Sequence, residues 1–208
     1  MTENQSSMDS ESSEDTVMAE NQSSTNSESS DDVSDSDIED LGQSVADQAR
    51  SFLIAVRAMA STQELGRTIP LLLLEVSQLL LAGARLAAQV DFVPEDKYET
   101  DVGPDPDLDA IRVSLAETLS GFDEYTEVFD PYFQPPELVT SRISDDVASI
   151  AGSITHGLKH HDAGRVEEAL WWWQFSYVAS WGGEASAALR ALQSIISHDR
   201  LDSEPEPV

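Results

Sequence analysis

The sequence predicts an all-α protein, a single bundle of five or six helices with a disordered acidic N-terminal tail. Apolar residues recur at helical spacing through most of the chain after residue 41, and short segments rich in Gly, Asp and Pro separate the periodic stretches. Three consecutive tryptophans, Trp171 to Trp173, stand in one strongly apolar segment. Because successive helical residues lie about 100° apart, three adjacent indoles cover more than half of a helix and need neighbours on several sides.

Residues 1–40 are predicted to be a disordered, acidic, Ser-rich tail. They carry 13 acidic and no basic side chains, and a 17-residue duplication repeats Glu3-Asn-Gln-Ser-Ser as Glu20-Asn-Gln-Ser-Ser. A segment with no aromatic residue and few aliphatic ones cannot bury enough apolar surface to offset chain entropy. It is either a solubilising tail or a docking and phosphorylation arm. The polar, Pro-containing residues 201–208 are a second predicted disordered tail, which leaves 41–200 as the helical bundle domain.

The first two predicted helices start near Val45 and near Ile69. The apolar face of the first consists of Val45, Ala49, Phe52, Leu53, Val56, Met59 and Ala60. The stretch 69–90 is apolar enough to raise the question of a membrane span, since about 20 apolar residues cross a bilayer. Its polar residues, however, share one side of a helix: Glu75, Gln78, Arg85 and Gln89. That stripe favours a bundle helix with one solvated edge over a membrane span.

Residues 91–136 hold an acidic connection, a third helix and an aromatic segment. Asp105 is the predicted N-cap of this helix, Pro106 its first residue and Gly121 its terminator, after the connection 91–107. The segment 122–136, which is aromatic and interrupted by prolines, is predicted to wrap the bundle in extended form, with short strand pairing as the alternative.

The fourth predicted helix covers 144–161, and a tight turn at Gly164 leads into the Trp helix. Gly182 and Gly183 are expected to kink or interrupt that helix before a last one follows. The inward residues of the fourth helix are Val147, Ile150, Ile154 and Leu158. Short turns make sequential helices antiparallel neighbours.

The charge balance excludes several classes of partner. The chain has 40 acidic and 11 basic side chains, a net charge of −29, and residues 41–208 alone hold 27 acids against the 11 bases. Nucleic-acid phosphates and anionic membrane surfaces repel such a protein, so neither direct nucleic-acid binding nor membrane binding is expected. Without cysteine there is no thiolate nucleophile, disulfide or Cys-ligated zinc. The N-terminus resembles no secretory signal, which predicts a cytoplasmic protein.

His156 and His160 are the candidate metal ligands. Spaced i, i+4, they share one helix face, although the His-Glu-x-x-His motif is missing because residue 157 is Gly. Asp146 is the third candidate; with Asp145 it is either an acidic first turn or a functional carboxylate pair. A cleft lined by Glu75, Arg85 and Arg57 is a further alternative. The chain has no phosphate-binding or nucleophile-elbow motif, so no cofactor and no catalytic residue is predicted.

Two patterns near the Trp helix resemble known families. The turn around Gly164 is similar to one tetratricopeptide unit, without the 34-residue period of a repeat array. The elements Trp-x-Trp-x-Phe, ending at Phe175, and Trp181-Gly182 resemble a bacterial, actinobacterial-type family of helical domains of unknown function. The resemblance implies the fold but no activity. It also implies acids or histidines in relatives near four positions, Ser149, Ser153, Ser180 and Glu184.

Three functions remain open. The complete core pattern and the missing catalytic motif favour a non-catalytic cytoplasmic module that binds an unknown protein partner. The first alternative is a metal-dependent helical-bundle enzyme that uses His156, His160 and Asp146. The second is an acidic decoy or regulator of a basic, nucleic-acid-binding partner, which would act through the acidic stretch 91–130.

Overall fold

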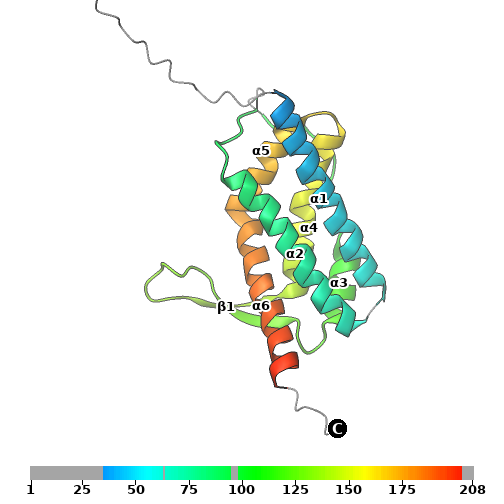
Figure 1. The fold of residues 1–208 in the computed structure, drawn as a ribbon, viewed down its shortest axis with the longest axis vertical. Helices are drawn as coiled ribbons and strands as arrows, with labels where there is room; N and C mark the ends of the chain where they lie inside the picture. Colours follow the sequence, from blue (N-terminus) through cyan, green and yellow to red (C-terminus); the bar gives the residue numbers. More distant parts are fainter. Residues whose placement is uncertain (1–34, 63, 95–97, 203–208) are drawn as a thin grey trace, which may run out of the picture. The chain divides into compact units, whose positions relative to one another are not determined.

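The computed structural model describes residues 35–62, 64–94 and 98–202, and in them helices predominate over a single two-stranded sheet (Figure 1). The elements in chain order are α1 (Asp35–Thr62), α2 (Leu65–Ala87), α3 (Asp109–Thr118), β1 (Glu124–Val128), β2 (Leu138–Arg142), α4 (Ile143–Asp162), α5 (Val166–Ser176), the π-helical turn η1 (Tyr177–Trp181) and α6 (Gly182–Leu201). The predicted fold class is confirmed. The predicted disorder of residues 1–34 and 203–208 falls outside the described residues.

Helices α1 and α2 form an antiparallel pair (Figure 1). The predicted face of α1 is buried except for the half-buried Ala60. The helix already begins at Asp35, so residues 35–40, which were predicted as tail, are helical. By length and composition α2 could cross a membrane. In the structure it packs against α1 and α6 and buries Leu72, Val76 and Leu79, as a bundle helix does.

Helix α3 begins at Asp109, four residues after the predicted N-cap. The N-cap position is Leu108, so the predicted start at Asp105 and Pro106 lies before the helix, and the backbone N–H of Asp109 donates to Asp107 Oδ1 at 3.1 Å. Gly121 follows the helix with φ +89°, a left-handed conformation that glycine adopts without strain, and this confirms its predicted role as terminator.

Helix α4 packs against α1, α3, α5 and α6, and its four predicted inward residues are all buried. Helices α5 and α6 follow as one continuous helical path through η1, where the chain takes an i→i+5 turn. The predicted interruption is thus found at η1, directly before Gly182-Gly183 rather than at the glycines, which are the first two residues of α6. Gly182 is needed for packing: a Cβ there would lie 2.5 Å from the carbonyl oxygen of Tyr177.

The centre of the bundle holds Trp173 and Trp181, which are 1% and 2% exposed. Gly157 of α4 lets the Trp173 ring lie against the helix backbone, because a side chain there would overlap the indole. The Trp173 indole N–H donates to the Ile154 carbonyl at 3.1 Å. Trp171 instead stacks on the exposed Phe175. Two of the four tryptophans thus form the predicted core.

Strands β1 and β2 form an antiparallel hairpin, here called the arm (residues 124–142), in register from Glu124↔Arg142 to Val128↔Leu138. The arm extends away from the helices (Figure 1). The prediction that 122–136 wraps the bundle is wrong, and the alternative of strand pairing is correct. The ladder pairs the inward-facing backbone groups of the two strands with each other, and their outward-facing N–H and C=O groups are left for solvent, so the strands can extend from the bundle.

Candidate functional site

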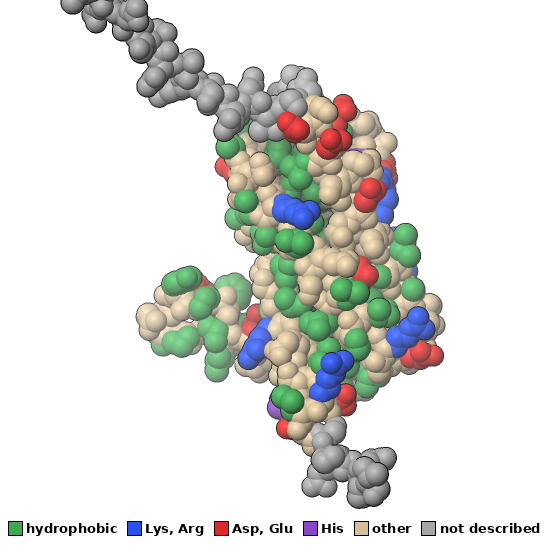
Figure 2. All heavy atoms as spheres, viewed as in Figure 1, with side chains coloured by type: hydrophobic (Ala, Val, Ile, Leu, Met, Phe, Trp, Pro, Cys, Tyr) green, Lys and Arg blue, Asp and Glu red, His purple; other side chains and the backbone are tan. Residues whose placement is uncertain are grey.

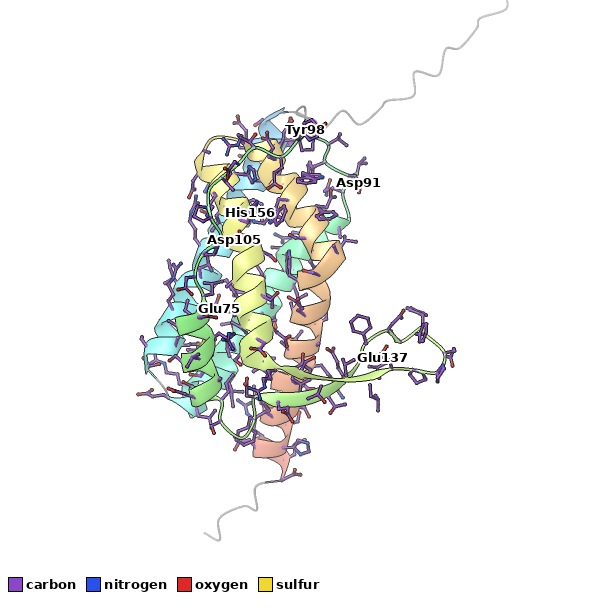
Figure 3. All side chains as sticks on the ribbon, turned by 180° about the vertical axis from the view of Figure 1, so that it is seen from behind. Glu75, Asp91, Tyr98, Asp105, Glu137 and His156 are labelled. Carbon is purple, nitrogen blue, oxygen red and sulfur yellow. The ribbon has the colours of Figure 1, made fainter. Side chains whose placement is uncertain are left out.

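His156 and His160 direct their Nε2 atoms at one carboxylate oxygen, Glu99 Oε1 (Figure 3 shows His156 on α4). His160 Nε2 lies 3.0 Å from Glu99 Oε1, and His156 Nε2 lies still closer to the same oxygen. One potential ligand atom from each of the three residues lies within 4.8 Å of the others. The side chain of His160 is fully buried, whereas that of Glu99 is 33% exposed. These residues are called the Glu99 cluster, and they unite two predicted ligands with one that was not predicted.

Several contacts orient the Glu99 cluster. Asp105 Oδ1 lies 3.4 Å from His156 Nδ1, and the Trp172 ring packs on the His156 ring with centroids 4.1 Å apart. Arg165 Nε donates to His160 Nδ1 at 3.4 Å. Burial would raise the pKa of Glu99, but its hydrogen bonds and electrostatic interactions with His156 and His160 outweigh that effect and leave the pKa lowered. The carboxylate is therefore held in its charged form.

Asp146 does not join the two histidines. It lies in the first turn of α4, and the ten residues to His156 span about 15 Å of helix. Its Oδ2 accepts a hydrogen bond from the Tyr125 hydroxyl at 2.6 Å. Burial raises the pKa of Asp146 to about 7, and although the Tyr125 hydrogen bond opposes this, the charge of Glu184 adds to it.

Glu184 lies near Asp146 and forms a hydrogen bond with Ser149. Its own pKa is raised by burial, and its Oε2 has no hydrogen-bond partner among the described residues. The structure thus brings together two of the four positions at which the resemblance implied polar residues in relatives. A carboxyl group that titrates near neutral pH is able to accept or donate a proton.

The alternative cleft of Glu75, Arg85 and Arg57 stays a prediction. Ten residues separate Glu75 from Arg85 in α2, about 15 Å along the axis. Burial raises the pKa of Glu75, and within the described chain its Oε2 lacks a hydrogen-bond partner.

The arm carries a group of exposed apolar side chains, most of them from the aromatic segment 122–136 (Figure 2). They are Val128, Phe129, Tyr132, Phe133 and Leu138, with exposed fractions of 43%, 71%, 91%, 58% and 69%. The loop between the strands is ordered by hydrogen bonds from the backbone N–H groups of Tyr132 and Phe133 to Asp130. A groove of about 790 Å³ separates the arm from α6 and is lined by Phe129, Ala191 and Ile195 among others.

Comparison with known proteins identifies the fold but no activity. The model of a domain of unknown function, DUF5063, matches residues 36–198. The crystal structure of protein BF1032 from Bacteroides fragilis is similar with a TM-score of 0.59 and 16% identity, over 79% of this chain and 92% of that chain. No curated protein matches. The expected family of uncharacterised helical domains is thus confirmed, while its actinobacterial distribution and its tryptophan signature stay predictions.

Two functional features escaped the sequence analysis for different reasons. Glu99 stands in an acidic connection and meets residues 57 and 61 positions later, a pairing that no local spacing encodes. The exposed aromatics of the arm had a signal, since Phe129, Tyr132 and Phe133 occur in a proline-interrupted segment without helical periodicity. Apolar residues outside any helical pattern need either a core of their own or a partner.

Proposed function

We propose that this chain, which belongs to the DUF5063 family of domains of unknown function, is a non-catalytic cytoplasmic module that binds another protein through the arm. The observation that carries the proposal is the set of five exposed apolar side chains on an ordered hairpin that extends from the bundle. Soluble proteins keep single apolar residues on their surfaces, but a contiguous apolar group on a projecting element marks an interaction site.

The size of the apolar group suits a specific interface. An aromatic side chain buries about 150–250 Å², so the exposed parts of Phe129, Tyr132 and Phe133 together would supply about half of the roughly 800 Å² that one partner contributes to a standard interface. Tyr is also among the residues that most often dominate binding energy. The two-stranded ladder fixes these side chains in advance, which reduces the entropy lost on binding.

The charges around the arm indicate the chemistry of the partner. Four acids lie on the arm, Glu124, Glu127, Asp130 and Glu137, against one base, Arg142. Arg142 is 4.0 Å from Glu124, near the bundle rather than at the tip. A second copy of this acidic chain would be repelled. We therefore propose a different protein that has an apolar cleft bordered by Lys or Arg.

The test compares two triple variants of the full chain. In the arm variant, Phe129, Tyr132 and Phe133 become Gln; in the control, Ile54, Leu81 and Val178 become Gln, which are 66%, 56% and 73% exposed on helices. Proteins that co-purify from a native lysate should be retained by the parent and the control and lost from the arm variant. Retention by the arm variant, or no stoichiometric partner for the parent, contradicts the proposal.

Salt separates this function from the acidic-decoy alternative. An interface centred on buried aromatic rings should persist in high salt, because salt screens the interactions between exposed charges and not the burial of apolar rings. Binding carried by the acids of residues 91–130 should weaken steeply with salt and on deletion of 91–107, and it should be indifferent to the arm variant. Such a result would show that the acidic surface, and not the arm, binds the partner.

A further inference from the structure

We propose that the Glu99 cluster binds one divalent first-row transition-metal ion, of which Zn²⁺ is the test case. The ligands are Glu99 Oε1 and the Nε2 atoms of His156 and His160. Solvent at the partly exposed Glu99 completes the coordination. The site is independent of the arm and of any partner that the arm binds.

The ligand atoms are already close to the spacing that coordination needs. Zinc lies about 2.0–2.2 Å from nitrogen and oxygen ligands, so ligand atoms in a tetrahedral site are about 3.3 Å apart. Here the Glu99 oxygen is 3.0 Å from His160 Nε2 and also contacts His156 Nε2, and all three atoms lie within 4.8 Å of one another. Small side-chain rotations make room for an ion.

The surroundings of His156 are those of a metal-ligating imidazole. Its Nδ1 is 3.4 Å from Asp105 Oδ1 and its Nε2 is against Glu99. A neutral imidazole carries one N–H and cannot donate to both carboxylates. If the proton is on Nδ1 and faces Asp105, an ion at Nε2 gives each ring nitrogen a partner. A carboxylate that accepts the other ring N–H is the usual orienting group of a histidine ligand. The Trp172 ring limits the rotation of His156.

Described residues before and after Glu99 hydrogen-bond to the helices. The backbone N–H of Phe92 donates to Gln174 Oε1 at 3.0 Å, and Lys159 Nζ donates to the Pro104 carbonyl. Glu99 is thus held near α4 before any ion binds. Two imidazoles and one carboxylate favour Zn²⁺, Co²⁺, Ni²⁺ or Fe²⁺ over Mg²⁺ and Ca²⁺, which prefer oxygen ligands.

Arg165 opposes the ion. Its Nε–H points at His160 Nδ1, which therefore accepts, whereas a neutral His160 that ligates through Nε2 carries its proton on Nδ1. Metal binding must open this contact, and the guanidinium charge also repels a cation. Removing the Arg165 side chain should consequently tighten binding, an effect that a purely structural Glu–His clasp would not show.

The experiment titrates the untagged full chain with Zn²⁺, measuring stoichiometry by calorimetry and stability by thermal shift. We expect one equivalent bound and a rise in Tm that Mg²⁺ and Ca²⁺ do not produce, because binding to the native state stabilises it. Glu99→Gln and His156→Gln should each weaken Zn²⁺ binding by at least about tenfold, because loss of a group that merely orients a metal ligand already lowers metal affinity by about that factor. Arg165→Ala should strengthen it. His198→Gln, an exposed histidine of α6, is the matched control and should bind like the parent.

Co²⁺ gives a second readout, because visible absorption bands report coordination by protein ligands. Comparing the metal-free Tm of the Glu99 and His156 variants with that of the parent shows that they fold. Less than about a tenth of an equivalent of Zn²⁺ bound, without a thermal shift, overturns the proposal. Binding that is unchanged in both variants overturns it equally, since the ion would then sit elsewhere on this acidic chain.

Discussion

The carboxylate of Asp123 accepts two hydrogen bonds from Ser144, one from its backbone N–H and one from its hydroxyl, each 2.8 Å long. Both residues are buried, and the Asp123 carbonyl also accepts the N–H of Ile143 at 2.9 Å. Asp123, which directly precedes β1, thereby caps the first turn of α4. The same contact fixes both ends of the arm against the bundle.

Asp123→Ala should lower the free energy of unfolding by about 1–3 kcal/mol, because it leaves buried donors at a helix N-terminus without an acceptor. Urea denaturation measures this loss. Asp130→Ala, at the tip of the arm, is the control and should change stability by no more than about 0.5 kcal/mol. Equal effects of the two substitutions would show that Asp123 is not an anchor.

Asp146 should make stability decrease as the pH rises toward neutrality. Burial chiefly raises its pKa from the ordinary 3.8 to about 7 in the fold, so between these values the native state holds a proton that the unfolded chain has lost. Stability is therefore highest below this window and falls as the pH rises through it. Asp146→Asn, which resembles the protonated carboxyl, should match the parent in Tm below about pH 3.8 and exceed it by a growing margin as the pH rises to about 7. Parallel Tm curves for the two proteins would disprove this assignment.

Gly157→Ala should destabilise the protein by about 1–3 kcal/mol, the usual penalty for overpacking a core. The added methyl group would overlap the Trp173 indole. Gly152→Ala on the same helix is the matched control. Its new Cβ would approach only Leu108 Cδ1, at 3.7 Å, so the better helix propensity of Ala should stabilise by about 0.5–1 kcal/mol. Chemical denaturation should give effects of opposite sign.

Trp173→Ala and Trp181→Ala should each cost about 3–5 kcal/mol, as removal of a buried large side chain does. Trp171→Ala removes a surface stack on Phe175 and should cost about 0.5–1.5 kcal/mol. Thermal melting distinguishes the two groups. If all three variants melted alike, the two buried indoles would not be the centre of the core.

The sequence predicted those parts of the fold in which neighbours along the chain decide the outcome. The inward residues of α4, such as Ile150 and Ile154, follow from helical periodicity alone. The direction of the arm does not, because it depends on Asp123 meeting Ser144, 21 positions later. Two of the three members of the Glu99 cluster were predicted, because the i, i+4 spacing of His156 and His160 is local, whereas Glu99 comes from a distant loop.

The π-helical turn η1 determines where the helical path from α5 to α6 tolerates the deletion of a residue. An i→i+5 turn holds one residue more than an α-helical turn, and one residue corresponds to about 100° of rotation. It therefore sets the angle at which α6 presents Ala185, Ala188 and Leu192 to the core. Residues 178–180 are exposed, so their side chains are open to substitution. Because the wider turn absorbs the extra residue, deleting one of them should restore an α-helical turn and keep α6 in register, whereas a deletion within α6 would rotate the residues that follow by about 100° and turn part of its small apolar face toward solvent.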